Sequence, residues 1–112
     1  RLDVFAGDDF NALGMMRVGG KGVISVSANV APRQMHDLCA AALAGDMERA
    51  EALNEWLTPL HNAMFCEPNP IPAKWGVEQL GMIESGLRLP MTRLSEAGQA
   101  QVRQAMTGIG LL

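Results

Sequence analysis

Residues 2–26, LDVFAGDDFNALGMMRVGGKGVISV, decide the fold of this 112-residue chain. Two short apolar runs, residues 2–6 and 22–26, lie on either side of a segment whose apolar residues have helical spacing. Continuous apolar runs of this length are typical of parallel strands that are buried on both faces. We therefore predict a β-loop-α-β unit whose two parallel strands are joined by a right-handed crossover.

The segment between the two runs is predicted to form a helix over residues 9–18. Asp8 or Asp9 can cap its N-terminus, because a short acidic side chain accepts hydrogen bonds from free backbone N–H groups. Gly19 and Gly20 are typical of a helix end. The apolar side chains of this helix are Phe10, Leu13, Met16 and Val18.

Two further helices are predicted for residues 32–64, because apolar residues recur there with helical spacing. Gly45 is expected to end the first of them, and Asp46 to cap the second. Pro59 lies inside the second helix and has no N–H to donate. We therefore expect a kink or a break near Thr58.

The last third of the chain begins with a rigid elbow, EPNPIP, at residues 67–72. Each proline restricts its own backbone and that of the preceding residue, so the helix can resume only at the end of the elbow. A short helix is then expected up to Gly81, followed by an extended stretch over residues 87–92. Ser95 is predicted to cap a final helix.

Two parallel strands and one connecting helix do not make a stable sheet by themselves. Both edges would stay open and both faces would need cover. The chain also opens with Arg1 instead of Met, and no basic and apolar signal segment follows it. We therefore expect an α/β fold whose two strands are the last of a larger β/α assembly, in a piece of a longer protein.

Composition excludes several classes of protein. Hydrophobic residues make up 48% of the chain and charged residues 19%, which is typical of a folded domain. A net charge of −3 argues against a nucleic-acid partner. The apolar runs are far shorter than the ~20 residues that cross a bilayer, so no membrane partner is expected.

Gly7, Asp8 and Asp9 follow the first strand and precede a helix, which is where β/α folds place their active sites. Two interpretations remain open. The acids can be a helix cap and a second carboxylate favoured by the helix dipole, or Gly7 can allow a ligand to approach the backbone closely.

Ser25, Ser27 and Asn29 lie at the end of the second strand. A serine nucleophile needs a neighbouring base, and no histidine here has triad-like placement. We interpret all three as hydrogen-bonding groups, with pocket lining as the alternative.

The remaining reactive side chains are scattered and predict no metal site. Cys39 is interpreted as a small core residue and His61 as a histidine that packs between helices. Lys74 is expected to make a salt bridge or a carbonyl contact, because a Schiff-base lysine needs a desolvated pocket. The residues alone supply no complete catalytic set.

Four stretches resemble the C-terminal part of the bacterial 4-hydroxy-tetrahydrodipicolinate synthase family, also named dihydrodipicolinate synthase. They are AGDD at 6–9, GGKGVISVSANVAP at 19–32, PLHNAMFCEPNPIPAKW at 59–75 and LRLPMT at 87–92. The resemblance extends over residues 2–112. The EPNPIPAKW and LRLPMT stretches together are specific to this synthase within its aldolase superfamily, which includes N-acetylneuraminate lyase.

The resemblance implies a TIM (β/α)8 barrel with a C-terminal helical extension, assembled as a cytoplasmic homotetramer. Residues 2–6 and 22–26 would be the seventh and eighth strands. Residues 1–45 would then be the end of the barrel, and residues 46–112 the helical domain.

The family is a lyase that condenses pyruvate with L-aspartate 4-semialdehyde in lysine biosynthesis through diaminopimelate. Pyruvate forms a Schiff base with a barrel lysine, so no other cofactor is implied. That lysine and the catalytic tyrosines would lie upstream, which leaves no catalytic residue in this chain and predicts that it is inactive alone.

The resemblance also assigns roles to single residues. Ile24 matches the position whose backbone carbonyl lies beside bound pyruvate, and Gly7 matches a glycine close to the same pocket. Asn69 matches a possible monovalent-cation contact, and Val18 a contact between dimers. No other metal ligand is implied.

Two alternatives stay open. The chain could be a non-catalytic helical assembly module, since it lacks the lysine and has a long apolar stripe from Met47 to Met64. It could also belong to a related aldolase such as N-acetylneuraminate lyase, which the EPNPIP elbow disfavours.

Overall fold

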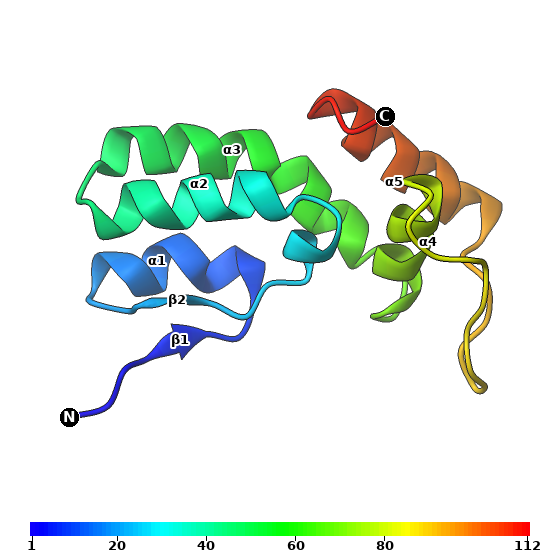
Figure 1. Ribbon diagram of the computed structural model, residues 1–112, viewed down its shortest axis with the longest axis horizontal. Coiled ribbons are helices and arrows are strands. Elements are labelled where there is room, and N and C mark those ends of the chain that lie inside the picture. Colours follow the sequence, from blue (N-terminus) through cyan, green and yellow to red (C-terminus); the bar gives the residue numbers. More distant parts are fainter. The chain divides into compact units, whose positions relative to one another are not determined.

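The computed structural model describes residues 1–112 as two compact units (Figure 1). One comprises Arg1–Thr58 and the other Pro59–Leu112. The boundary at residues 45 and 46 remains a prediction about the parent fold, because the compact units divide further along the chain. None of the helices combines the length and the apolar character that crossing a membrane requires.

The first unit contains two parallel strands, β1 (Phe5–Ala6) and β2 (Gly22–Val23). Phe5 pairs with Gly22 and Ala6 with Val23. A further hydrogen bond follows the paired residues, from the Ile24 N–H to the Ala6 carbonyl at 2.8 Å. The parallel pairing confirms the predicted β-loop-α-β unit.

The strands are shorter than the apolar runs that predicted them, and their burial on both faces was predicted wrongly. Leu2 is 88% exposed and Phe5 52% exposed. The helix α1 (Ala12–Arg17) contacts both strands. No second layer of this unit covers their other side, so apolar side chains there remain in solvent.

Local sequence explains both ends of the connecting helix. The Asp8 carboxylate accepts a hydrogen bond from the Phe10 N–H at 3.0 Å, which caps the short 3₁₀ turn η1 (Asp9–Asn11) before α1. At the other end the Gly20 N–H bonds to the Met15 carbonyl at 2.9 Å. A Cβ atom at Gly20 would lie 2.7 Å from Met15 Cγ, so this turn requires glycine.

Two helices complete the first unit, α2 (Pro32–Leu43) and the first part of α3 (Met47–Met64). Asp46 accepts a hydrogen bond from the Arg49 N–H at 3.2 Å, as predicted for the cap of α3. The buried core joins α1 to these helices through Leu13, Met16, Ala41, Ala42 and Ala50.

Pro59 does not break α3. The helix continues to Met64, and just before the proline the Thr58 hydroxyl donates to the Asn54 carbonyl at 2.7 Å. Proline removes one backbone hydrogen bond from a helix, and here the remaining bonds keep the chain helical. The two compact units nevertheless divide at this residue.

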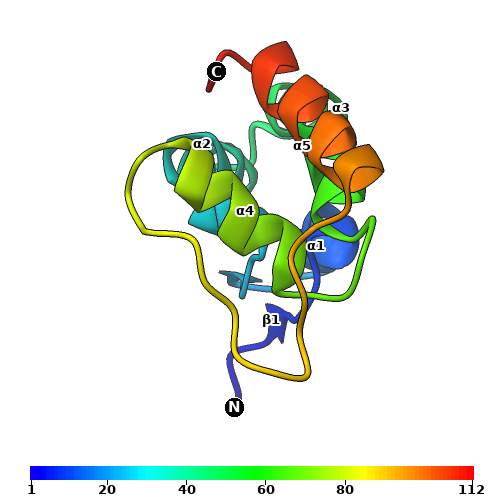
Figure 2. The same cartoon turned by 90° about the vertical axis from the view of Figure 1, so that its right-hand side faces the viewer.

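The second unit consists of the end of α3, then α4 (Ile71–Gln79) and α5 (Glu96–Gly108). The helices α4 and α5 pack against each other (Figure 2). Gly81, with φ +73°, ends α4, and the Ser95 hydroxyl caps α5 by accepting from the Gly98 N–H at 3.1 Å. Both features were predicted. The buried apolar face of this unit includes Leu60, Ile71, Trp75, Leu94, Val102 and Met106.

The stretch over residues 87–92 was predicted as extended, and this is wrong at its centre. The Met91 N–H bonds to the Arg88 carbonyl at 3.1 Å and closes a turn. The peptide bond between Leu89 and Pro90 in this turn is cis. No neighbouring strand is present to hold the backbone straight.

Candidate functional site

The two strands end at the same edge of the sheet, because they are parallel and directly paired. Gly7, Asp8 and Asp9 follow β1 at this edge. Residues 24–27 follow β2 and lead into a second 3₁₀ turn, η2 (Ser27–Asn29). This strand-end edge is the candidate site, since ligands of open and closed β/α folds bind at the carboxyl ends of the strands.

The Asp9 carboxylate joins the two chain segments at the strand-end edge. It is 1% exposed, and its Oδ2 accepts from the Val26 N–H at 3.0 Å and from the Ser27 N–H at 2.9 Å. Its Oδ1 accepts from the Ser25 hydroxyl. Asp9 therefore fastens the backbone that leaves β2.

Sequence reasoning missed this role of Asp9. The sequence predicted a cap from Asp8 or Asp9 and a second carboxylate favoured by the helix dipole, whereas Asp8 caps the helix and Asp9 turns toward the next strand. The available signal was a second acid that the cap did not need, beside serines at the end of a neighbouring parallel strand.

The serines act as hydrogen-bonding groups, as predicted. Ser25 Oγ donates to Asp9 and accepts from the Ala28 N–H at 2.9 Å. Ser27 is buried and presents its N–H to Asp9. The Asn29 amide donates to the Val26 carbonyl at 2.9 Å. Pocket lining by these three residues stays a prediction.

Ile24 and Gly7 offer backbone atoms at the strand-end edge. Ile24 is 72% exposed, and its N–H is bonded to Ala6 while its carbonyl accepts no backbone hydrogen bond within the chain. A Cβ atom at Gly7 would meet nothing within 4 Å. Together they can present a carbonyl acceptor and an uncovered backbone to a small ligand, and neither supplies a nucleophile or a base.

The other candidate residues lie away from the strand-end edge in sequence and are not gathered into a site. Val18 follows α1 and is 83% exposed. Asn69 is exposed and precedes a cis peptide bond to Pro70 in the elbow. No three side chains among the His, Cys, Asp and Glu residues are placed to hold a metal ion.

The two cysteines are free thiols. Burial raises the pKa of the Cys39 thiol above its ordinary value of 9.0, and the charge of Asp9 raises it further. Burial and the charge of Glu67 likewise raise the pKa of Cys66. Both thiols are therefore poor nucleophiles at neutral pH.

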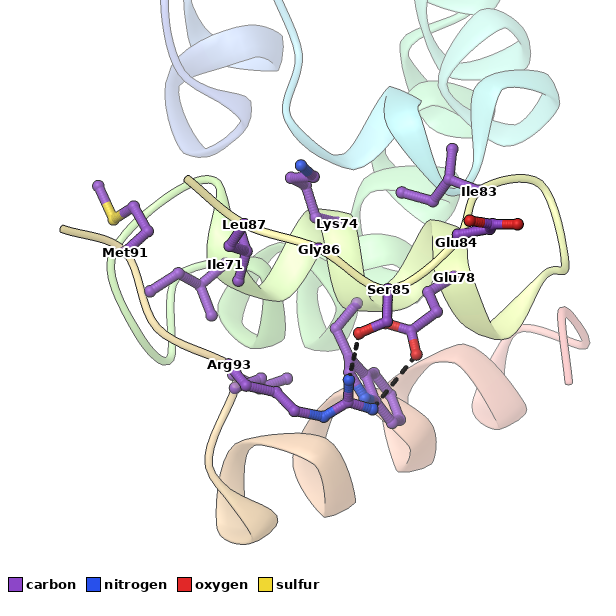
Figure 3. Close-up of a pocket in the computed structure, with 12 residues that line it drawn as sticks. Ile71, Lys74, Glu78, Ile83, Glu84, Ser85, Gly86, Leu87, Met91 and Arg93 are labelled. Atoms are coloured by element: carbon purple, nitrogen blue, oxygen red, sulfur yellow. Dashed lines mark hydrogen bonds and ion pairs between the residues drawn. The ribbon is translucent and has the colours of Figure 1, made fainter. Parts of the chain in front are cut away.

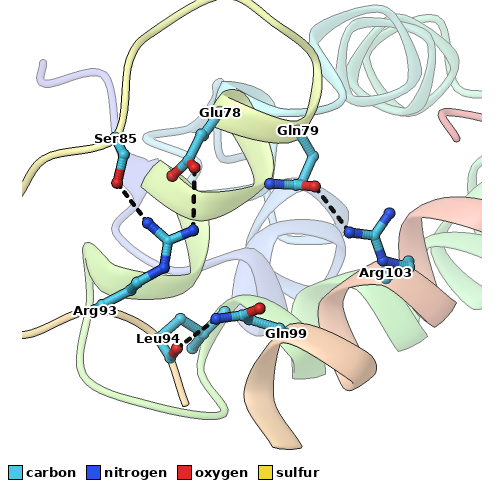
Figure 4. A network of polar contacts seen from close by, with 7 residues as sticks. All are labelled: Glu78, Gln79, Ser85, Arg93, Leu94, Gln99 and Arg103. Atoms are coloured by element: carbon cyan, nitrogen blue, oxygen red, sulfur yellow. Dashed lines mark hydrogen bonds and ion pairs between the residues drawn. The ribbon is translucent and has the colours of Figure 1, made fainter. Parts of the chain in front are cut away.

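The second unit contains a pocket of about 120 Å³ between α4 and the loop that precedes α5 (Figure 3). Arg93 crosses it, paired with Glu78 at 3.2 Å and bonded to the Ser85 hydroxyl (Figure 4). These contacts tie the loop to α4. Lys74 also lines the pocket, without the salt bridge or carbonyl contact that its sequence position suggested.

A second polar contact joins α4 to α5. The Arg103 guanidinium lies 5.2 Å from the centroid of the Trp75 ring. It also donates a hydrogen bond to the Gln79 side chain at 2.8 Å (Figure 4). The polar side chains of this unit therefore brace its loop and helices.

Comparison with known proteins gives a consistent result along the whole chain. The model of the dihydrodipicolinate synthetase family matches residues 1–109. The chain is 84% identical over 112 residues to the 4-hydroxy-tetrahydrodipicolinate synthase of Halorhodospira halophila, covering 100% of this chain and 37% of the relative. It is 56% identical over 109 residues to the enzyme of the same name from Stutzerimonas stutzeri, covering 97% and 37%.

Solved structures agree with these relatives. A chloride-inhibited dihydrodipicolinate synthase from Acinetobacter baumannii, complexed with pyruvate, superimposes with a TM-score of 0.95 at 43% identity, covering 99% of this chain and 38% of that chain. The synthase from Aquifex aeolicus gives 0.95 at 42% identity, covering 98% and 38%. The chain thus spans about 37% of the length of the curated relatives. This chain belongs to the dihydrodipicolinate synthetase family.

Proposed function

We propose that this chain is the C-terminal part of a 4-hydroxy-tetrahydrodipicolinate synthase, the lyase that condenses pyruvate with L-aspartate 4-semialdehyde in lysine biosynthesis through diaminopimelate. One observation carries the proposal, which is 84% identity along the full chain to an enzyme of that name. The likeness to a synthase that holds pyruvate supports the same conclusion.

In this proposal β1 and β2 are the seventh and eighth strands of a (β/α)8 barrel. Residues 1–45 complete the barrel and residues 46–112 form its helical extension. Two features of the structure support this placement. The β1–β2 pair is parallel and has two open edges. Leu2 and Phe5 expose apolar surface that neighbouring elements of a barrel would bury.

The chain would supply the lining of the pyruvate pocket while the nucleophile comes from outside it. A lysine amine attacks the keto carbon of pyruvate, water leaves, and the resulting imine takes up a proton from solvent. The Ile24 carbonyl dipole beside that imine would stabilise its positive charge. Gly7 would leave room for the substrate, since the space next to its Cα is open.

Further parts of the proposal concern assembly and ions. Val18 would lie in a contact between dimers of a homotetramer, which fits its exposed apolar side chain. Asn69 would contribute an oxygen to a monovalent-cation site at the elbow. The covalent imine would be the sole cofactor-like species, and the enzyme would work in the cytoplasm.

The test is covalent trapping of pyruvate. The full-length protein that carries this chain is incubated with pyruvate and borohydride, and its intact and peptide masses are measured. We expect one reduced pyruvate adduct per polypeptide, on a lysine outside residues 1–112. An unmodified protein, or an adduct on Lys21 or Lys74, contradicts the proposal.

A further inference from the structure

We propose that Asp9 is a positioning residue for pyruvate, which it aligns by holding the backbone that carries the Ile24 carbonyl. The inference rests on the proposed function, in which that carbonyl lies beside the substrate. Asp9 itself is buried and touches its protein partners, so its action would pass through the backbone.

The Asp9 carboxylate accepts its hydrogen bonds from the chain that leaves the neighbouring strand. Ser25, Val26 and Ser27 donate these bonds, and all three belong to the segment directly after Ile24. The helix that Asp9 begins is capped by Asp8. Asp9 is therefore not needed as a helix cap, and its carboxylate instead binds the backbone at the end of the neighbouring strand.

Ile24 lies between two anchored points of the backbone. On its N-terminal side the Ile24 N–H is bonded to the Ala6 carbonyl at 2.8 Å. On its C-terminal side Ser25 and Val26 are bonded to Asp9. The Ile24 carbonyl belongs to the planar peptide unit that joins it to Ser25, so anchoring both neighbours sets the direction of the carbonyl oxygen.

The chemistry of the buried Asp9 carboxylate supports the same role. Burying a carboxylate is costly unless hydrogen bonds or a cation compensate it. The two ion pairs of the structure, Arg17–Glu51 and Arg93–Glu78, do not involve Asp9, and neutral donors surround it instead. Hydrogen bonds to an ionised acceptor are stronger than those to a neutral one. A charged anchor therefore restrains the segment more firmly than an amide would.

The experiment compares three variants of the full-length enzyme. Asp9→Ala removes all three bonds, and Asp9→Asn keeps the shape while replacing one acceptor oxygen with a donor. The matched control is Asp46→Ala, which removes another aspartate hydrogen bond in the same unit. Asp46 belongs to the turn between α2 and α3, and this turn lies at the end of the unit opposite the strand carboxyl ends (Figure 1).

Two readouts separate positioning from stability. The first readout is kinetic: the KM for pyruvate and kcat are determined separately, together with the pyruvate concentration that half-saturates borohydride trapping. We expect Asp9→Ala to raise the KM and the half-saturating concentration about tenfold, a change equal to about 1.4 kcal/mol. The values for Asp9→Asn should lie between those of Asp9→Ala and of the wild type. The second is hydrogen exchange of the Val26 and Ser27 amides, which should accelerate in both Asp9 variants. Asp46→Ala should lower the melting temperature and leave both readouts unchanged.

The outcomes are distinguishable from failure of the proposed function. Wild-type enzyme that traps no pyruvate overturns the proposed function, and the positioning role with it. Wild-type trapping with an unchanged pyruvate KM in Asp9→Ala overturns the positioning role alone. Equal changes of KM in Asp9→Ala and Asp46→Ala would assign the effect to stability and would likewise overturn it. If Asp9→Ala is insoluble, the same comparison of the pyruvate KM is made with Asp9→Asn.

Discussion

Glu67 and Gly98 approach so closely that a Cβ atom at Gly98 would lie 2.7 Å from Glu67 Oε2. The two residues come from the elbow and from the first turn of α5. The Glu67 carboxylate accepts hydrogen bonds from the Ser95 hydroxyl and from the Ser95 N–H. Glycine at position 98 is thus what lets the elbow carboxylate reach the cap of α5.

Gly98→Ala is expected to lower the free energy of unfolding by about 1–3 kcal/mol, the usual cost of overpacking. The added methyl group would also lie 2.6 Å from Leu94 Cδ1, so two neighbours must move. Urea unfolding measures the change. Gly108→Ala on the same helix is the control, because a Cβ atom there meets nothing within 4 Å and alanine is the better helix former. Equal stability of the two variants would contradict the packing argument.

Arg103→Ala should destabilise the protein by about 0.5–1 kcal/mol, the range for a cation–π contact at an exposed site. The substitution removes the guanidinium from the Trp75 ring and the bond to Gln79. It should also change Trp75 fluorescence, measured in a Trp56→Phe background so that one tryptophan remains. Arg33 is exposed and unpaired with any acid, so Arg33→Ala should alter neither quantity.

Ser25→Ala should cost about 1–2 kcal/mol of stability, because its hydroxyl both donates to Asp9 and accepts from the Ala28 N–H. Ser25→Thr keeps the hydroxyl and should recover most of this loss. Thermal unfolding of the full-length protein is the measurement. Ser85→Ala, which removes one exposed hydroxyl from Arg93, should cost under about 0.5 kcal/mol. A larger loss at Ser85 than at Ser25 would refute the assigned roles.

The Cys39 thiol should add a pH-dependent contribution to stability at alkaline pH. Its pKa in the folded protein lies above the ordinary value of 9.0, through burial first and the Asp9 charge second. The folded state therefore holds the proton more tightly than the unfolded state. The resulting stabilisation is complete below the unfolded pKa and is lost as the pH rises through the folded pKa.

Denaturant unfolding of a Cys66→Ala protein at pH 7 and at pH 10 measures this contribution. Stability should fall more between the two values than it does in the Cys39→Ala, Cys66→Ala double variant. Cys39 should also react with iodoacetamide more slowly in the folded than in the unfolded chain at pH 8. Identical pH dependence in the two proteins would show that burial of this thiol does not matter.

The helices and their ends could be predicted well, because they depend on neighbouring residues. Asp8 caps the first helix and Ser95 the last, each by a hydrogen bond to a backbone N–H two or three residues away. Gly45 has φ +80° and separates α2 from α3. Backbone propensity and short-range hydrogen bonds decide such features, and both can be predicted from a few consecutive residues.

The candidate site could be predicted in part. The sequence placed Gly7 and Ile24 at strand ends, and parallel pairing brings those ends to one edge. It did not distinguish the roles of Asp8 and Asp9, since both precede the helix and carry the same side chain. The expectation of buried strands also failed, because burial of Phe5 depends on elements that would lie against it and not on its own run of residues.

By itself, the sequence determined the order of elements, their caps and the family to which the chain belongs, since each of these follows from local pattern. Tertiary structure alone decided that the Asp9 carboxylate binds Ser25, which is 16 residues away. It also decided that position 98 must be glycine to leave space for the Glu67 carboxylate. The reason is geometric. Side chains distant in sequence meet only after strand pairing and helix packing have set the positions of their backbones, and no local preference encodes those meetings.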